Sequence, residues 1–315
     1  MSIAAYLREI GRGKDGARSL TRAQAHDLMC QVLDGRVSDL EVGGFALAMR
    51  IKGESAAELE GFLDAVHERS VALVADRPWV VLPSYNGARR LPNLTPLLAL
   101  LLAQEGVPVL VHGPLQDPAR VTSADIFRDL GLPFANDASD VAHAWARHEP
   151  VFMRTEALCP ALARLLDVRR VVGLRNSGHT VAKLLAPGST ALRVVNYTHP
   201  EYASLLGEFL PRIAAHALLM RGTEGEPVAD PRRFPRLEVY VGGVSRPDLS
   251  RAAQEGVLTE LPVLPLGRDA ATTAVYIQAV VSGEKPAPTP IARQVECMVQ
   301  TLTALATASA QERFA

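Results

Sequence analysis

Hydrophobic residues recur at helical spacing through the first quarter of the chain. From Leu20 to Ser70 they repeat every three or four positions, in runs separated by glycines. The runs occupy residues 21–35, Asp39–Arg50 and Ala56–Arg69, with Thr21 and Ser55 as capping residues. This pattern predicts a helical domain over residues 1–75.

After Pro78 the pattern changes to short apolar runs that are rich in branched residues and are typical of buried strands. The predicted strands are Val80–Leu82, Val107–Val111, Val171–Val172, Leu192–Val195, Ala217–Met220 and Leu237–Val241. Helical patterns between several of them predict an α/β domain with a mostly parallel central sheet over residues 76–315. We expect helices near residues 156–187 to return to the first domain, and a final helix from about Ile291 to Thr307.

A polar turn, Ser84–Thr95, follows the first predicted strand. Asn93 or Thr95 is expected to cap the next helix, and Arg89 and Arg90 lie just upstream. The first turn of a helix has unpaired N–H groups and partial positive charge, so this turn predicts a phosphate site. The phosphate could belong to a small cofactor or to a nucleic acid.

The amino-acid composition limits the kinds of ligand and cellular setting that the sequence predicts. A chain of 315 residues that is 48% hydrophobic can bury a substantial core, and 33 basic against 34 acidic residues leave no global basic signal. Binding of a polyanion would therefore require local clustering of charge. The three cysteines have neither paired nor metal-ligand spacing, which favours a reduced, cytoplasmic setting. We expect no signal sequence, no membrane insertion and no metal site.

Motifs up to about residue 230 resemble those of anthranilate phosphoribosyltransferases and their nucleoside-phosphorylase relatives. They lie at Gly35–Asp39, Arg50–Ser55, His112-Gly113, Thr122–Asp125, Gly173–Arg175 and Gly222 with Gly225. The resemblance implies a small helical domain, a larger α/β domain and dimerisation through the helices.

The residues that bind phosphate in those enzymes are mostly replaced. Where the enzymes have Gly-Thr-Gly-Gly-Asp around the pyrophosphate, this chain has Tyr85–Arg89 and keeps only Gly87. Loss of glycine matters because glycine lets backbone approach a phosphate closely. Asn93 and Thr95 remain from the helix start, whereas the Lys-His-Gly-Asn-Arg motif is reduced to His112-Gly113.

The acidic pair that binds magnesium in those enzymes is also replaced. The resemblance places Pro227 and Val228 at its positions, although Glu224 and Glu226 are close enough to substitute. We therefore assign no catalytic residue, no metal ligand and no cofactor. The alternative is magnesium with phosphoribosyl pyrophosphate.

The replacing residues have a pattern of their own. Tyr85–Pro96 together with Gly173–Thr180 resembles the YbiB-type branch of these proteins, which implies nucleic-acid binding without sequence preference and a homodimer with a basic groove. The candidate phosphate-binding residues are Asn86, Gly87, Arg89, Arg90, Asn93, Thr95, Arg175, Asn176, His179 and Lys183.

Each candidate also has a structural alternative. The arginine pair could be simply solvated, and Asn176–Thr180 could be a helix-capping turn. His112 and His179 could titrate near neutral pH and strengthen anion binding in acid, or be hydrogen-bonded structural histidines. Tyr85 could stack on a base, although aromatic residues make up only 5% of the chain. The favoured hypothesis is a nucleic-acid-binding protein rather than an enzyme, and the alternative is a divergent phosphoribosyltransferase with an unknown acceptor.

Overall fold

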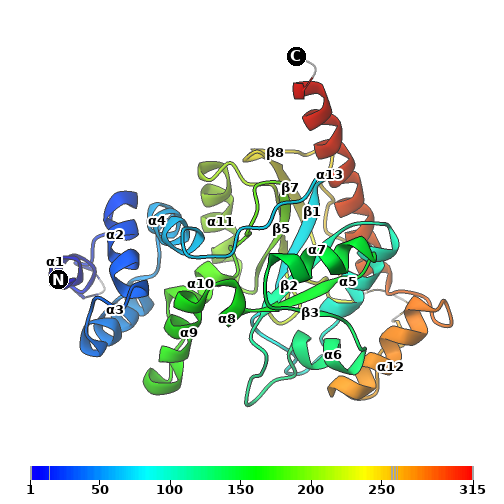
Figure 1. Ribbon diagram of the computed structural model, residues 1–315, viewed down its shortest axis with the longest axis horizontal. Helices are drawn as coiled ribbons and strands as arrows, with labels where there is room; N and C mark the ends of the chain where they lie inside the picture. The colour runs from blue at the N-terminus through cyan, green and yellow to red at the C-terminus, as the bar shows by residue number, and fades with distance from the viewer. Residues whose placement is uncertain (1, 14, 257, 259, 261, 314–315) are drawn as a thin grey trace.

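The computed structural model describes residues 2–13, 15–256, 258, 260 and 262–313 (Figure 1). Its helices are α1 (Ala4–Ile10), α2 (Arg22–Leu33), α3 (Asp39–Lys52), α4 (Ala56–His67), α5 (Thr95–Gln104), α6 (Ser123–Asp129), α7 (Ala138–Ala146), α8 (Thr155–Leu158), α9 (Pro160–Val172), α10 (Ser177–Ala182), α11 (Glu201–Arg212), α12 (Ala270–Val281) and α13 (Thr289–Arg313). Its strands are β1 (Trp79–Pro83), β2 (Val109–Gly113), β3 (Phe134–Ala135), β4 (Val151–Arg154), β5 (Ala191–Tyr197), β6 (Ala217–Arg221), β7 (Leu237–Val241) and β8 (Val244–Ser245).

Helices α2, α3 and α4 begin within one residue of the predicted positions, and α1 was not predicted. Thr21, Ser38 and Ser55 each form a capping box, in which the cap side chain and the residue three positions later bond each other's backbone N–H. Helices α2 and α4 pack so closely that a Cβ on Gly61 would lie 2.3 Å from the Arg22 carbonyl oxygen. The helical unit is thus defined by local caps and one tight helix pair.

One eight-stranded sheet forms the centre of the rest of the chain, in the order β3-β4-β2-β1-β5-β6-β7-β8. The strands from β3 to β6 pair in parallel, and β7 and β8 are antiparallel additions at one edge. Alternate residues enter different cores, since Val81 belongs to the cluster on the helical-domain side and Val80 to the cluster on the other. The predicted helical domain with a mostly parallel α/β domain is confirmed.

One predicted strand is wrong. Val171–Val172 is the end of α9, and Gly173 closes that helix with φ 77° in the left-handed region. Val171 is 90% exposed, so two adjacent valines alone did not indicate a buried strand. The short strands β3, β4 and β8 were not predicted, and the last helix extends beyond the expected bounds at both ends.

The segment around residues 156–187 returns to the N-terminal helices. Helix α9 contacts α2, and α10 contacts α3 and α4. In Figure 1 these helices lie between the N-terminal helices and the sheet. Among the described residues, no helix combines the length and the apolar character needed to cross a bilayer.

Candidate functional site

The turn after β1 wraps around the carboxylate of Glu226. The N–H groups of Asn86 and Gly87 donate to Oε1 at 2.6 and 2.7 Å, and the hydroxyls of Ser84 and Thr95 donate to Oε2. Glu226 is only 2% exposed, so this carboxylate is a buried anion held by four donors.

A second carboxylate binds the next part of the same turn. Glu224 accepts hydrogen bonds from the N–H groups of Arg89 at 2.9 Å, Arg90 at 2.9 Å and Leu91 at 3.2 Å. Burial raises the pKa of Glu224, but these backbone bonds outweigh burial and hold the pKa below its ordinary value. The chain's own glutamates therefore occupy the anion-binding side of the turn.

Both the turn after β1 and the segment that carries the glutamates have a residue with positive φ at this contact. Gly87 has φ 69°, and a Cβ there would lie 2.7 Å from the Val121 carbonyl oxygen. Glu224 has φ 53°, a left-handed conformation that is unusual for a residue with a side chain. We refer to residues 84–91 together with Glu224 and Glu226 as the glutamate clasp.

The expected cap of the helix after this turn is wrong. Leu94 stands at the N-cap of α5 without a side-chain cap, while Asn93 Oδ1 accepts from Thr95 N–H at 3.1 Å. Asn93 also donates to Ser123 Oγ at 3.0 Å and is 3% exposed, and Thr95 is fully buried. Both side chains are therefore engaged inside the protein.

Two cations brace the clasp. Arg175 donates to the Asn86 side chain and to the Tyr85 carbonyl oxygen, the latter at 3.4 Å. Lys183 donates to the Gly225 carbonyl oxygen at 3.1 Å. Burial lowers the pKa of Lys183 to about 8, with Glu226 opposing this shift and Arg175 and Arg120 adding to it.

Arg89 and Arg90 are the exposed members of the candidate set. Their backbone N–H groups bind Glu224, whereas both residues as a whole are exposed. Arg268 donates to the Arg89 carbonyl oxygen and so brings a third arginine to the same place. The N–H groups on the inner side of the turn are thus occupied by glutamates, and the outer side of the turn carries exposed arginines.

The histidines follow the structural alternative. Burial, with the charges of Arg175 and Arg169, lowers the pKa of His179 to about 3. Burial lowers the pKa of His112 to about 4, and its ring contacts Tyr85 Oη at 2.9 Å and the Leu185 carbonyl oxygen at 3.2 Å. Of the two alternatives, these pKa values favour structural histidines over histidines that titrate near neutral pH.

Two further candidates are used in packing. Asn176 caps α10 by accepting from Gly178 N–H at 3.0 Å, and it donates to the Leu165 carbonyl oxygen at 2.8 Å. The capping-turn alternative is therefore the one observed. Tyr85 is 6% exposed with its hydroxyl bonded to His112 and Thr155, so base stacking by Tyr85 is excluded in this conformation.

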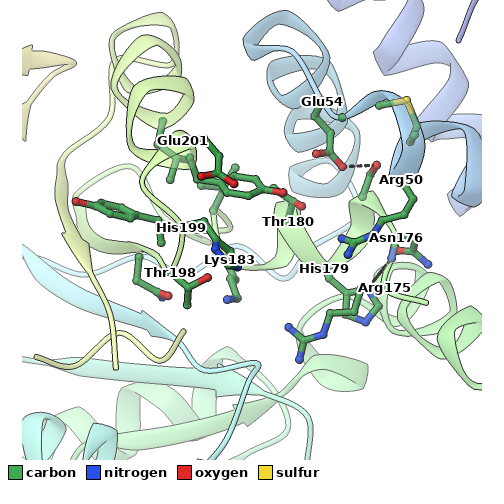
Figure 2. Close-up of a pocket in the computed structure, with 18 of the residues that line it drawn as sticks. Arg50, Glu54, Arg175, Asn176, His179, Thr180, Lys183, Thr198, His199 and Glu201 are labelled. Carbon is green, nitrogen blue, oxygen red and sulfur yellow. Dashed lines mark hydrogen bonds between the residues drawn. The ribbon is translucent and has the colours of Figure 1, made fainter. Parts of the chain in front are cut away.

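A cavity of about 530 Å³ lies beside the clasp, between the N-terminal helices and the α/β domain. Figure 2 shows Arg50 and Glu54 on one wall, Thr198, His199 and Glu201 on the opposite wall, and Lys183 between them. Asn86 belongs to both the clasp and the cavity lining. The cavity was not predicted, because its walls come from α3, α10, the end of β5 and α11.

Asn196 in this cavity lacks partners for its amide. It is 5% exposed, and neither Oδ1 nor Nδ2 has a hydrogen-bond partner among the described residues. A second cleft of about 820 Å³ is lined by Arg169 and Arg170, and His179 borders both spaces. Both hollows have linings of mixed charge, and in the second cleft Arg169 pairs with Asp117 and Arg170 with Asp167.

Three potential metal ligands meet elsewhere, in the helical domain. His26 Nε2 lies 2.7 Å from Glu68 Oε1, and Cys30 Sγ lies 3.5 Å from His26 Nε2. The sequence did not indicate this group, because Glu68 is brought in from the end of α4. Cys30, Cys159 and Cys297 are buried and free.

Comparisons with known proteins define the class. Residues 4–70 match the model of the helical bundle domain of the glycosyl transferase family. The structure aligns with anthranilate phosphoribosyltransferase from Thermus thermophilus over 96% of this chain and 89% of that one, with a TM-score of 0.72 and 24% identity. It also aligns with the Saccharomyces cerevisiae enzyme in complex with PRPP and Mg over 98% of both chains, with a TM-score of 0.63 and 14% identity.

Sequence comparison adds closer relatives. Anthranilate phosphoribosyltransferase from Symbiobacterium thermophilum is 30% identical over 71% of this chain and 65% of its own. The uncharacterized protein YbiB from Escherichia coli K12 is 40% identical over 98% of this chain and 97% of its own. The chain belongs to the anthranilate phosphoribosyltransferase-like proteins of glycosyltransferase family 3, in their YbiB-type branch.

Proposed function

We propose that this protein binds nucleic acid without sequence preference, through contacts to phosphates. The observation that carries the proposal is the glutamate clasp: Glu224 and Glu226 occupy the inner N–H donors of the turn, while Arg89 and Arg90 are exposed. Arginine suits a polyanion because its planar donor fork pairs with phosphate oxygens and stays charged.

The clasp disfavours a small metal-bound diphosphate. Such a ligand would have to displace two carboxylates. Their oxygens accept six hydrogen bonds of 2.6–3.2 Å from backbone N–H groups of the turn. The same carboxylate oxygens are then not free to coordinate magnesium, which needs oxygen ligands. We infer that this protein's own glutamates fill the place that the pyrophosphate site has in the enzymes.

The basic groups around the clasp extend the surface available to a phosphate backbone. Arg50, Arg175 and Lys183 line the cavity next to it, and Arg169 and Arg170 line the neighbouring cleft. Glu54 and Glu201 also line the cavity, and Asp117 and Asp167 pair with the two arginines of the cleft, so the charge in both is mixed. Phosphate contacts spread in this way carry no sequence information.

The double variant R89A/R90A tests the proposal. Loss of two phosphate contacts is expected to weaken binding to a fluorescein-labelled DNA or RNA by about tenfold. Fluorescence anisotropy at low salt measures the affinity. The variant R147A/R246A removes the same charge from exposed arginines that pair with Glu149 and Asp248. Unchanged affinity in R89A/R90A would remove these residues from the binding site.

Affinity is also expected to fall as pH rises from 7 to 9. The pKa of Lys183 is about 8, and a bound phosphate favours the protonated amine, so deprotonation above pH 8 weakens binding. Anisotropy across this pH range measures the effect, and K183Q should bind more weakly and lose most of the pH dependence. A wild-type profile that is flat over this range would contradict a role for the amine.

A divergent phosphoribosyltransferase is the second candidate. It is favoured by the anthranilate phosphoribosyltransferase relatives and by the survival of Asn93 and Thr95 at the start of α5. Calorimetry with phosphoribosyl pyrophosphate and magnesium separates the two functions. Saturable binding that is lost in T95A would favour the enzyme, and no heat of binding would favour the nucleic-acid-binding protein.

We propose further that the protein is a cytoplasmic homodimer formed through the helical domain. Leu40, Leu47 and Ile51 are 86%, 43% and 68% exposed, and their spacing places them on one face of α3. An apolar hollow of about 300 Å³ between α1 and α3 includes Ile51. An apolar face of this kind fits a second copy of the chain.

The variant L47E/I51E is expected to be monomeric. Two glutamates placed on this face would have to be desolvated in the dimer, which opposes association. Light scattering coupled to size-exclusion chromatography measures the mass, and L47A/I51A serves as the uncharged control. A dimer that persists in L47E/I51E would place the interface elsewhere.

A further inference from the structure

A smaller cleft of about 310 Å³ lies at the connection between the two parts of the fold. It is lined by residues 67, 70–72, 186–189 and 193. The chain leaves the N-terminal helices through the first of these segments and enters β5 through the second. The two segments are joined by a hydrogen bond from Leu73 N–H to the Pro187 carbonyl oxygen at 2.7 Å. The cleft therefore borders both connections.

Arg193 on β5 contributes a buried cation to this cleft. The residue is 8% exposed and donates from Nη1 to the Leu184 carbonyl oxygen at 2.9 Å. Its Nε is buried without a partner, and no carboxylate of the described chain forms an ion pair with it. Burial lowers the pKa of Arg193 to about 10, and the guanidinium is still charged at neutral pH. A buried arginine is normally paired, so this charge lacks its counterion.

The neighbouring histidines leave the charge of Arg193 unbalanced. His67 has a buried Nε2 with no partner in the part of the chain that the structure describes, and burial together with the charge of Arg193 lowers its pKa to about 4. His216 also has a lowered pKa, through burial and then Arg193. Both rings are neutral near pH 7. The N–H of neutral His67 faces the Ala186 carbonyl, so its Nε2 is an acceptor and can bind a protonated oxygen of a ligand.

We propose that this cleft binds a small oxyanion of the phosphate type, held by Arg193 and His67, with the Ser189 hydroxyl at its edge. The guanidinium of Arg193 donates to a phosphate oxygen, and the unpartnered Nε2 of His67 accepts from the hydroxyl that a protonated phosphate carries. The volume admits inorganic phosphate or the phosphate end of a small metabolite.

The site is separate from the glutamate clasp. Arg193 is four residues before Tyr197 along β5, about 13 Å of extended strand, and Tyr197 lines the larger cavity beside the clasp. The side chain of Arg193 points to the same face of the sheet as Val195, which packs on the helical-domain side. An anion bound there would contact both connecting segments and favour one arrangement of the two parts.

Ser189 allows a test that does not depend on removing the buried arginine. It is exposed at the edge of the cleft, so S189E can place a carboxylate beside Arg193 and fill the site from within. S189Q has a similar shape without charge and is the matched control. Calorimetry and thermal unfolding would be measured with inorganic phosphate and with ribose 5-phosphate, at equal ionic strength set with sodium chloride.

Wild-type protein is expected to bind phosphate saturably at concentrations up to about 10 mM, with a rise in Tm. S189E should weaken that affinity at least about tenfold, whereas S189Q and R147A/R246A should retain it. Tighter binding of ribose 5-phosphate than of inorganic phosphate would identify a phosphorylated metabolite as the ligand, and the reverse order would identify the free ion. Absence of binding in the wild type, or equal binding in S189E, overturns the proposal. R193M should also abolish binding, and the S189E and S189Q pair decides the question if R193M does not fold.

Discussion

Replacing Glu226 by alanine is expected to lower the free energy of unfolding by about 3 kcal/mol or more. The carboxylate is 2% exposed and accepts from two backbone N–H groups and two hydroxyls. Its removal leaves these buried donors without an acceptor and cuts the contact between the β1 turn and the segment after β6. Urea unfolding followed by circular dichroism measures the change.

Two comparisons make this result specific. E208A removes an exposed glutamate from α11 and should change stability by less than about 0.5 kcal/mol. Inorganic diphosphate should stabilise E226A more than the wild type, because it can accept from the N–H groups that the carboxylate has left. If E226A is as stable as the wild type, the carboxylate does not hold the turn, and the inferred closure of the site fails with it.

Nucleic-acid affinity is expected to fall by about two orders of magnitude between 50 and 200 mM salt. Four phosphate contacts give a slope of about −3.6 in the logarithm of affinity against the logarithm of salt concentration, because each contact releases counterions. Anisotropy titrations with two unrelated DNA sequences, each single- and double-stranded, measure both the slope and any sequence preference.

The arginine variants connect this slope to particular side chains. R89A/R90A should reduce the slope by about two, one for each lost phosphate contact, and R147A/R246A should leave it unchanged. The two DNA sequences should bind alike, since phosphates carry no base information. Affinity that is insensitive to salt, or a strong preference for one sequence, would contradict the proposed mode of binding.

Much of the fold was predictable because its signals are local. Thr21 and Ser55 cap helices where the pattern indicated, and the branched runs of β1, β2 and β5 to β7 form strands near their expected positions. The error at Val171–Val172 has a local cause too. A run of two residues cannot distinguish a strand from the end of a helix, and the following Gly173 was the better signal.

The phosphate site that the sequence indicates at residues 84–95 stays a prediction, and the contacts within this turn could not be read from the sequence. The turn at residues 84–95 does hold an anion, and that anion is a glutamate 140 residues away from Asn86. The sequence suggested Glu224 and Glu226 as substitute metal ligands, because they lie close to the positions of the acidic pair that binds magnesium in the related enzymes. Nothing in the sequence indicated which groups these carboxylates contact. The structure places their oxygens on N–H donors instead.

The sequence by itself determined the caps of α2 and α4, most of the alternation of strands and helices, and the family, and it predicted an anion site at the turn of residues 84–95. These features depend on neighbouring residues or on motifs that are contiguous in the chain. Only the tertiary structure decided which groups fill that turn, which histidines are neutral, and that Arg193 is buried without a carboxylate partner among the described residues. The physical reason is that burial and pairing of charge depend on segments far apart in the sequence, which the packing of β1, β5 and β6 brings together.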